Sequence, residues 1–183
     1  MTIPDGTVAS LAMYPFAPLR AATDDLWSVV RRHLGGGPPS LEWVVVTPDV
    51  WRHPQLLLAQ ACGWPLVTEL ADRVAVVGTF DYDVPGCEHG TYRSVIISRH
   101  DTTLDELRSH SGVVAVINSD DSLSGWISLQ VAWGGRPSTV LETGAHLQSV
   151  RAVADGRADV ASIDAVTWAH VAHLEPSLVA GLH

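Results

Sequence analysis

The chain has 183 residues, of which 46% are hydrophobic and 17% are charged. This composition is typical of a folded α/β protein with buried strands and argues against a disordered chain. The formal net charge is −9, and all eleven basic residues are arginine. We therefore expect no nucleic-acid partner, because affinity for a phosphate backbone comes from clustered positive charge.

No apolar run approaches the roughly 18 residues that a membrane span needs, so we expect no membrane insertion. Residues 1–10 lack the basic region and long apolar core of a secretory signal. We expect a periplasmic or extracellular location if a signal has been removed, and a cytoplasmic one otherwise. Cys62 and Cys87 are too few for a disulfide scaffold or a zinc cluster, and either one bridge or two free thiols is compatible with the sequence.

In the first half of the chain, apolar residues that recur every three or four positions predict a helix over residues 18–34. A short apolar run at 8–13 precedes it. Short, apolar and partly β-branched runs predict buried strands at 43–46, 56–59 and 74–77. A short helix is expected to begin near Gly63.

In the second half, strands and helices alternate. The predicted strands are 95–97, 113–117, 139–141 and 160–163. The predicted helices are 103–108, 126–133, 147–154 and 166–173. Such alternation predicts a parallel sheet with helices on both faces.

Ligands of open α/β sheets bind beyond the carboxyl ends of the strands, so the strand–helix junctions deserve most weight. Residues 118–126 follow a predicted strand and bring Ser122, Ser124 and Gly125 to the start of a helix. Hydroxyls and unpaired N–H groups at a helix start favour an oxyanion. A simple serine N-cap explains the same pattern.

Two further junctions carry polar side chains. His146 begins the helix after the strand 139–141, where it is either an anion ligand or a partly exposed capping histidine. Asp164 follows the strand 160–163, where it is either a ligand-facing carboxylate or the N-cap of the next helix. In the first half, Tyr14 and the Cys62–Gly63 turn occupy comparable junctions, although an aromatic residue such as Tyr14 is more often part of the core.

No known catalytic motif of the serine hydrolase, zinc protease, nucleotide-binding loop or dinucleotide-binding type is present. The remaining histidines lack metal-ligand spacing, and His170 and His173 on one predicted helix have no carboxylate-rich companion motif. We therefore expect no metal, no cofactor and no catalytic residue.

Five stretches resemble the phosphate/phosphite/phosphonate family of ABC-transporter substrate-binding proteins. They are LAMYPF at 11–16, LLLAQACGWPLV at 56–67, VPGCEHGTYRSVIISR at 84–99, VINSDDSLSGW at 116–126 and TGAHLQSVRAVADGRADVASIDAVTW at 143–168. The resemblance implies a type II periplasmic-binding-protein fold, with two Rossmann-like lobes joined by a hinge and a ligand trapped between them.

Carried over by position, the resemblance implies that Ser122, Ser124 and Gly125 cradle an oxyanion, that His146 bonds it, and that Asp164 receives an amine or hydroxyl of the ligand. Residues Tyr14, Cys62 and Gly63 would form the wall of the first lobe. The resemblance also implies that Cys62 and Cys87 lie within bridging range, about 4.4–6.8 Å between Cα atoms.

The resemblance further implies a first lobe at 1–92, with the hinge crossing at 92–95, a second lobe at 93–168, and a C-terminal helix at 169–183 that heads back to the first lobe. Family members continue past this point and return to the first lobe with another strand. We therefore expect either a chain truncated at its C-terminus, whose first lobe lacks the return segment, or a first lobe that is completed in another way.

The leading functional interpretation is a receptor that binds a small phosphate- or phosphonate-like anion without altering it and passes it to an ABC permease. One alternative is a cofactor-biosynthesis enzyme of the same fold, of the thiamine-pyrimidine or menaquinone-pathway type. Such an enzyme needs an activated residue, for which His146 and Cys62 are the candidates. A second alternative is a cytoplasmic ligand sensor.

Overall fold

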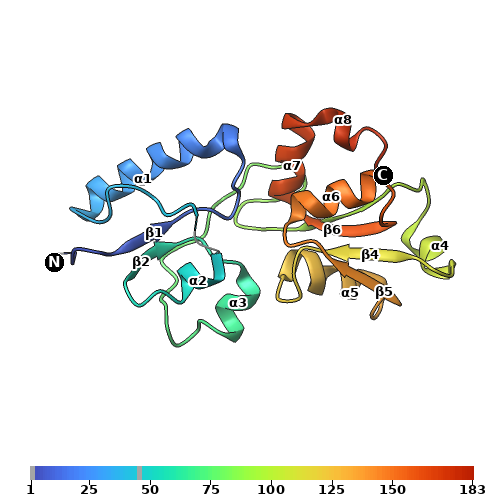
Figure 1. Ribbon diagram of the computed structural model, residues 1–183, viewed down its shortest axis with the longest axis horizontal. Helices are drawn as coiled ribbons and strands as arrows, with labels where there is room; N and C mark the ends of the chain where they lie inside the picture. Colours follow the sequence, from blue (N-terminus) through green and yellow to red (C-terminus); the bar gives the residue numbers. More distant parts are fainter. Residues whose placement is uncertain (1–2, 45–46) are drawn as a thin grey trace. The chain divides into compact units, whose positions relative to one another are not determined.

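The computed structural model describes residues 3–44 and 47–183. The chain divides into two compact units, Met1–Val74 and Ala75–His183, which we call unit 1 and unit 2. The lobe boundaries predicted at residues 92 and 168 stay predictions. Figure 1 shows the elements in chain order.

Unit 1 contains a parallel pair of strands, β1 (Val8–Ser10) and β2 (Leu56–Ala59). Its helices are α1 (Arg20–Leu34), which follows a 3-10 turn η1 (Ala17–Leu19), and the short α2 (Thr47–Trp51) and α3 (Gly63–Thr68). The core joins β1 to α1 through Ala9, Leu11, Trp27 and Leu41. The indole of Trp27 also donates a hydrogen bond to the carbonyl of Pro38, which fixes the chain that returns from α1.

Two strands predicted in the first half of the chain need correction. Residues 43 and 44 are not in a strand, and residues 45 and 46 lie outside the described residues. The segment 74–77 is not a strand either, and Val76 and Val77 are 67% and 82% exposed. An apolar run becomes a buried strand only where neighbouring strands pair with it and other elements cover its faces, and this run has no strand partner among the described residues.

Unit 2 is built on a four-stranded sheet. Its strands are β3 (Ser94–Ser98), β4 (Val114–Ile117), β5 (Thr139–Glu142) and β6 (Val160–Asp164), in the order β3-β6-β4-β5. β4 is parallel to β5 and to β6, as predicted. β3 runs antiparallel to β6, which corrects the prediction of a wholly parallel sheet. Alternation of strands and helices does not determine the direction of a strand at the end of a sheet.

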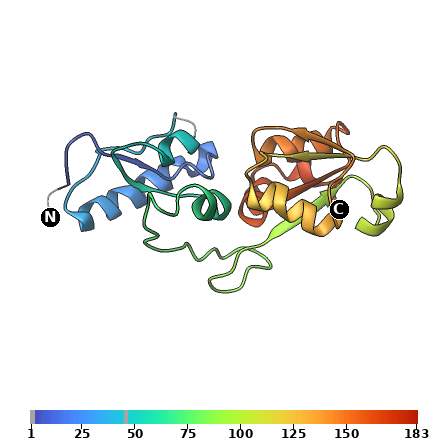
Figure 2. The same cartoon turned by 90° about the horizontal axis from the view of Figure 1, so that it is seen from below.

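Helices cover both faces of this sheet. The helices of unit 2 are α4 (Leu104–Ser109), α5 (Ser128–Trp133), α6 (His146–Ala154), α7 (Ala165–Leu174) and α8 (Pro176–Val179), and a π-helical turn η2 (Leu123–Ile127) precedes α5. Figure 2 shows α5 and α6 on opposite sides of the sheet. Within the described residues, no helix combines the length and the hydrophobicity that crossing a lipid bilayer requires.

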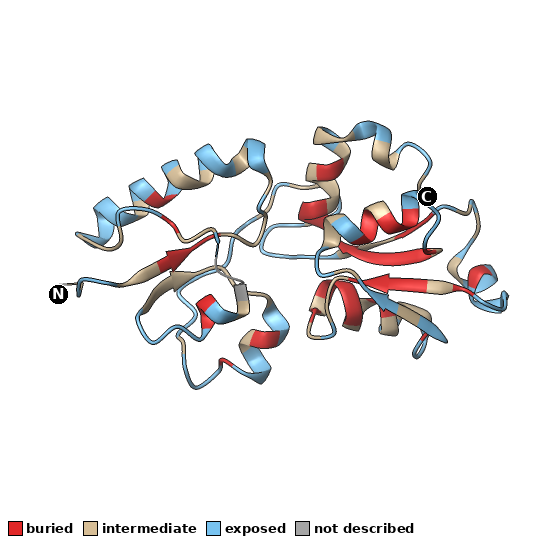
Figure 3. Cartoon of the chain, viewed as in Figure 1, coloured by how far each residue is buried: buried red, intermediate tan, exposed pale blue. Residues whose placement is uncertain are grey.

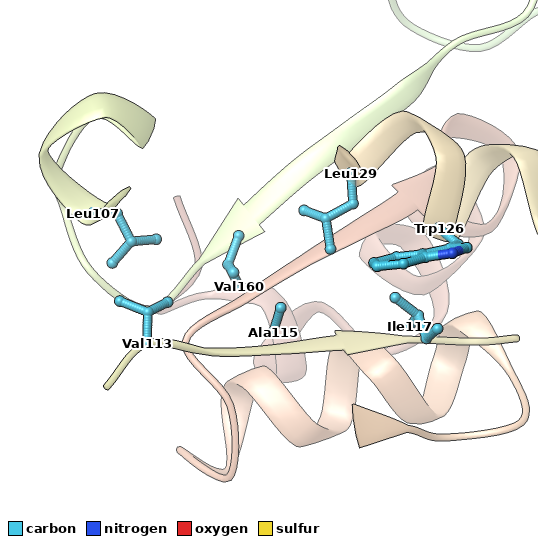
Figure 4. Packing of buried hydrophobic residues seen from close by; sticks show 7 residues of the cluster. All are labelled: Leu107, Val113, Ala115, Ile117, Trp126, Leu129 and Val160. Carbon is cyan, nitrogen blue, oxygen red and sulfur yellow. The ribbon is translucent and has the colours of Figure 1, made fainter. Parts of the chain in front are cut away.

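The core of unit 2 follows the period-2 alternation of the strands. On the α5 face, Ala115 and Ile117 of β4 and Val160 of β6 pack against Trp126 and Leu129 (Figure 4). On the other face, buried residues of β4 and β6 meet α6. All five residues of β6 are buried (Figure 3), because β6 has strands on both sides and helices on both faces.

The C-terminal segment packs on unit 2. Helix α8 packs against α6 and α7, and the backbone of His183 exchanges hydrogen bonds of 2.8 and 2.9 Å with Ser98 of β3. The structure therefore places residues 169–183 within unit 2, whereas the resemblance implied a segment heading back to the first lobe.

Candidate functional site

The candidate site lies at the carboxyl ends of β4 and β6. Because β4, β5 and β6 are parallel, the loops that follow them leave the same edge of the sheet. These loops bring together Ser122, Ser124, Gly125, His146 and Asp164, which we call the junction cluster. All five were predicted from the sequence as ligand-binding residues. The structure confirms that they lie together, whereas their binding of a ligand stays a prediction.

Ser122 and Gly125 form the turn that opens the helical segment η2–α5. Ser122 has an extended backbone, and its side-chain oxygen accepts a hydrogen bond of 3.0 Å from the N–H of Gly125. Ser122 is therefore an N-cap, which is the simpler of the two alternatives for this residue. Its hydroxyl proton remains available as a donor, because the cap uses only the oxygen as an acceptor.

Ser124, His146 and Asp164 form the centre of the junction cluster. The Ser124 hydroxyl lies 2.9 Å from Nε2 of His146, and the same Nε2 lies 3.6 Å from Oδ2 of Asp164. The other carboxylate oxygen of Asp164 accepts a hydrogen bond of 2.7 Å from the N–H of Thr167 and so caps α7. Asp164 and Ser124 are buried. Asp164 is thus the N-cap of α7, which is one of the two alternatives for its position, and its other oxygen lies toward His146. Its role as a ligand-facing carboxylate stays a prediction.

The imidazole of His146 is held toward its neutral form. Burial lowers its pKa below the usual value, because an apolar environment disfavours the charged ring, while the charge of Asp164 and the backbone of Ser162 oppose this shift. At neutral pH the ring is therefore an uncharged group with one donor and one acceptor nitrogen. His146 is partly exposed, with 13% of its side chain accessible, but it is not a capping residue, because the N-cap of α6 is Ala145 and no side chain caps that helix.

Asn118 is a residue of the site that the sequence analysis did not select. It directly follows β4, and its Oδ1 is buried with no hydrogen-bond partner, as is Nδ1 of His146. A Cβ atom on residue 125 would come within 1.8 Å of this Oδ1, so only glycine leaves room for the asparagine side chain. The signal that could have identified Asn118 is its place as the first residue after a buried strand.

Buried polar atoms without partners are costly in a folded protein and are often satisfied by a ligand or an ordered water. The junction cluster combines such atoms with hydroxyl groups, a neutral imidazole and a carboxylate, and it contains no arginine. This set of groups suits a small polar ligand that carries both acceptor oxygens and a hydrogen to donate to Asp164.

The junction cluster does not have the geometry of a nucleophilic serine site. In such a site the acid bonds one imidazole nitrogen and the serine bonds the other, so that the acid orients the base. Here Ser124 and Asp164 both approach Nε2, while Nδ1 has no partner. Among the described residues, no group of three or more histidine, cysteine, aspartate or glutamate side chains is arranged to hold a metal ion.

The residues predicted for the first lobe lie in unit 1. Tyr14 follows β1, and its carbonyl accepts a hydrogen bond from Phe16. Cys62 stands before the first residue of α3, Gly63, with an extended backbone and no side-chain cap. Cys62 and Cys87 are both free thiols. They belong to different units, and their separation within bridging range stays a prediction. A contribution of Tyr14, Cys62 and Gly63 to ligand binding stays a prediction.

No protein-family model matches the chain. No curated protein matches it either. Among solved structures, the chain is similar to a binding-protein component of an ABC phosphonate transporter from Pseudomonas aeruginosa, with a TM-score of 0.72 and 14% sequence identity. The match covers 97% of this chain and 62% of that one, so the chain spans less than two thirds of that protein's length. This likeness shows a mixed α/β fold like that of periplasmic binding proteins, as predicted. The type II assignment and the hinge stay predictions.

Proposed function

We propose that the protein is a solute-binding receptor whose junction cluster binds a small phosphate- or phosphonate-like anion and leaves it chemically unchanged. The observation that carries the proposal is the convergence of three strand–helix junctions on Ser124, His146 and Asp164, beside the unpartnered buried oxygen of Asn118. The likeness in fold to a phosphonate-transporter binding protein supports the same proposal.

In this proposal the oxyanion replaces an internal contact. The hydroxyl of Ser124 turns from His146 toward a ligand oxygen, and His146 donates to the ligand from the nitrogen that carries its proton. Asp164 accepts a hydrogen from a protonated ligand oxygen or from an amine on the ligand. Each neutral donor contributes about 0.5–1.5 kcal/mol, and bonds to a charged oxygen lie at the upper end of this range or above it.

The role of a receptor carries further proposals about partner and location. A binding protein of this kind delivers its ligand to an ABC permease, and it works in the periplasm or outside the cell. Both rest on the proposed function, so a demonstrated ligand is the first requirement.

The test is isothermal calorimetry with inorganic phosphate and methylphosphonate on the whole chain. We expect the Ser124→Ala variant to bind the better of the two anions about tenfold more weakly, because one donor is lost. His146→Ala should lose more, because this substitution removes a donor and leaves Asp164 without its neighbour. Ser138→Ala is the matched control, since Ser138 is exposed and lies outside the junction cluster.

Because burial lowers the pKa of His146, we expect the charged imidazole to strengthen anion binding only well below pH 6.5, unless the bound anion raises that pKa again. If neither anion binds, or if both site variants bind as tightly as the Ser138→Ala control, the junction residues are helix caps and the proposal is wrong.

A further inference from the structure

The outer edge of β3 offers a row of backbone hydrogen-bonding groups. β3 is the end strand of the sheet. The carbonyl of Arg93 accepts a hydrogen bond from Ala165, on the β6 side, and the backbone groups of an antiparallel strand alternate between its two edges. The N–H and C=O groups of Ser94 and Ile96 therefore point away from β6, toward the outer edge.

One end of this edge already holds an extended segment. The N–H and C=O of His183 both bond to Ser98, at 2.8 and 2.9 Å. Such an exchange of two bonds between the same residues defines an antiparallel pair. Beyond this pair, the outward backbone groups of Ile96 and Ser94 are open to further antiparallel pairing. Both residues are only half-buried.

A hollow of about 440 Å³ lies beside this edge. Its apolar wall comes from Val95 of β3 and from Trp168, Ala169 and Ala172 on one face of α7, while Arg93 and His173 also line it. Val95 stands on the face of the sheet that carries α7, so the hollow opens where alternate side chains of an added strand would point. A hollow of this size lies within the range of ligand pockets, about 300–1,000 Å³.

Arg93 supplies positive charge at this hollow. No ion pair forms between Arg93 and any acidic side chain of the described chain, although the protein carries a net charge of −9. Its guanidinium lies against the backbone of Gly86, where a Cβ atom would come within 2.1 Å of it. Arg93 is exposed, so its guanidinium can pair with a carboxylate of a partner.

From these observations we propose a second binding site, distinct from the junction cluster. The outer edge of β3 and the adjoining hollow bind a short extended peptide by adding it to the sheet as an antiparallel strand. Its backbone bonds to Ser94 and Ile96, one apolar side chain enters the hollow, and a carboxylate pairs with Arg93. Main-chain bonds supply affinity in this mode, and the side-chain pocket supplies selectivity.

The first test uses an acetylated hexapeptide of alternating threonine and valine that ends in glutamate, titrated into the whole chain labelled with nitrogen-15. We expect the amide signals of Ser94 and Ile96 and the indole signal of Trp168 to shift together, with those of Val95 and Ile97 less affected. A peptide of the same sequence with alternate backbone nitrogens methylated should bind at least tenfold more weakly, because it cannot complete the ladder. Equal binding of the two peptides overturns the proposal.

The second test uses variants of the edge and of the hollow. Ser94→Pro removes an outward N–H at the first residue of an end strand, where proline is tolerated. It also removes the hydroxyl that bonds Ser128, a loss that Ser94→Ala shares. We expect it to weaken peptide binding about tenfold, while the matched control Ser94→Ala, which keeps the N–H, should change binding less than twofold.

Ala169→Leu fills the hollow and should weaken binding to a similar extent. Arg93→Gln should weaken it several-fold, and Arg157→Gln, an exposed arginine paired with Asp155 elsewhere on unit 2, should not. If acetylvaline, a small acid that cannot form a strand, binds as tightly as the hexapeptide, the hollow is a small-molecule site and strand addition is excluded. None of these outcomes depends on whether the junction cluster binds phosphate.

Discussion

Strands β2 and β6 show that the two units bury a strand to different extents. β2 has the sequence LLLA and β6 has the sequence VASID, so β2 is the more hydrophobic. All four residues of β2 are nevertheless half-buried, whereas all five of β6 are buried. β2 has one strand neighbour and β6 has two. Burial is therefore decided by neighbours, and the sheet of unit 2 can enclose even a serine and an aspartate.

This contrast has a functional consequence. Burying a polar group costs free energy unless it finds a partner, and unit 2 buries Ser124, Ser162 and Asp164 in one place. The hydroxyl of Ser162 bonds the carbonyl of Ser124 at 2.6 Å and so anchors the η2 turn to β6. The well-packed unit thus provides the rigid support that a preorganised binding site needs.

The largest expected effect compares the same truncation in the two units. Leu129→Ala removes a side chain that is 0% exposed in the core of unit 2, and we expect the free energy of unfolding to fall by about 2–5 kcal/mol. Leu57→Ala in the half-buried β2 should cost clearly less. Denaturant unfolding measures both, with Val131→Ala, which is 77% exposed in the same helix as Leu129, as the control. Equal losses at 129 and 57 would show that the two units are packed alike.

The next prediction concerns the crowding at Gly125. Gly125→Ala places a Cβ against Oδ1 of Asn118 and 3.1 Å from the hydroxyl of Ser122, and such overpacking costs about 1–3 kcal/mol. Gly181→Ala is the matched control, because nothing lies within 4 Å of its added Cβ. Adding Asn118→Ala to Gly125→Ala should recover part of the loss. If the double variant is no more stable than the sum of the two single effects predicts, the contact between residues 118 and 125 does not cause the stability loss of Gly125→Ala.

A smaller effect is expected from pH. The pKa of His146 is lowered in the folded chain by burial, so below about pH 6.5 the unfolded chain binds the proton more readily and the free energy of unfolding falls as the pH drops. His146→Gln should flatten this dependence. His170, whose pKa burial also lowers, accounts for part of the remaining slope. The measurement is denaturant unfolding between pH 7.5 and 5. If the free energy of unfolding of His146→Gln depends on pH as steeply as that of the unchanged protein, His146 is not the cause of the pH dependence.

The sequence predicted most of unit 2 because its signals were local. Apolar runs located β4 and β6, and the serines after β4 identified the helix start at Ser122. The antiparallel direction of β3 was missed, because strand direction depends on pairing between Ser94 and Asp164, which are distant in sequence. The strand predicted at 74–77 failed for the same reason, since an apolar run does not reveal whether a neighbour exists.

The candidate site was predictable as a set of residues but not as a geometry. Parallel strands with loops at one edge implied that Ser124, His146 and Asp164 converge. No pattern in the sequence indicates that Ser124 and Asp164 share one imidazole nitrogen, which is the feature that separates this cluster from a nucleophilic serine site. Asn118 was missed because its importance comes from the absence of a partner, and only the folded structure reveals that absence.

The smallest expected effect comes from adding a helix N-cap to unit 1, by analogy with a cap that unit 2 already has. Helix α4 begins with a capping box, in which the side chain of Thr103 accepts from the N–H of Glu106 and the carboxylate of Glu106 accepts from the N–H of Thr103. These bonds lower the pKa of Glu106 to about 2, because they favour its charged form. Helix α3 starts at Cys62 with a similar extended backbone, at φ −69° and ψ 145°, and no side-chain cap.

Cys62→Ser should therefore supply a cap without moving the backbone. The third residue of α3 is Pro65, which has no N–H, so the new hydroxyl can accept only from Trp64. We expect a gain of about 0.5 kcal/mol, at the low end for an N-cap. Cys87→Ser, in a loop, is the control and should leave stability unchanged. If both variants change stability equally, the effect comes from removing a thiol; a gain confined to residue 62 shows that α3 lacked a cap.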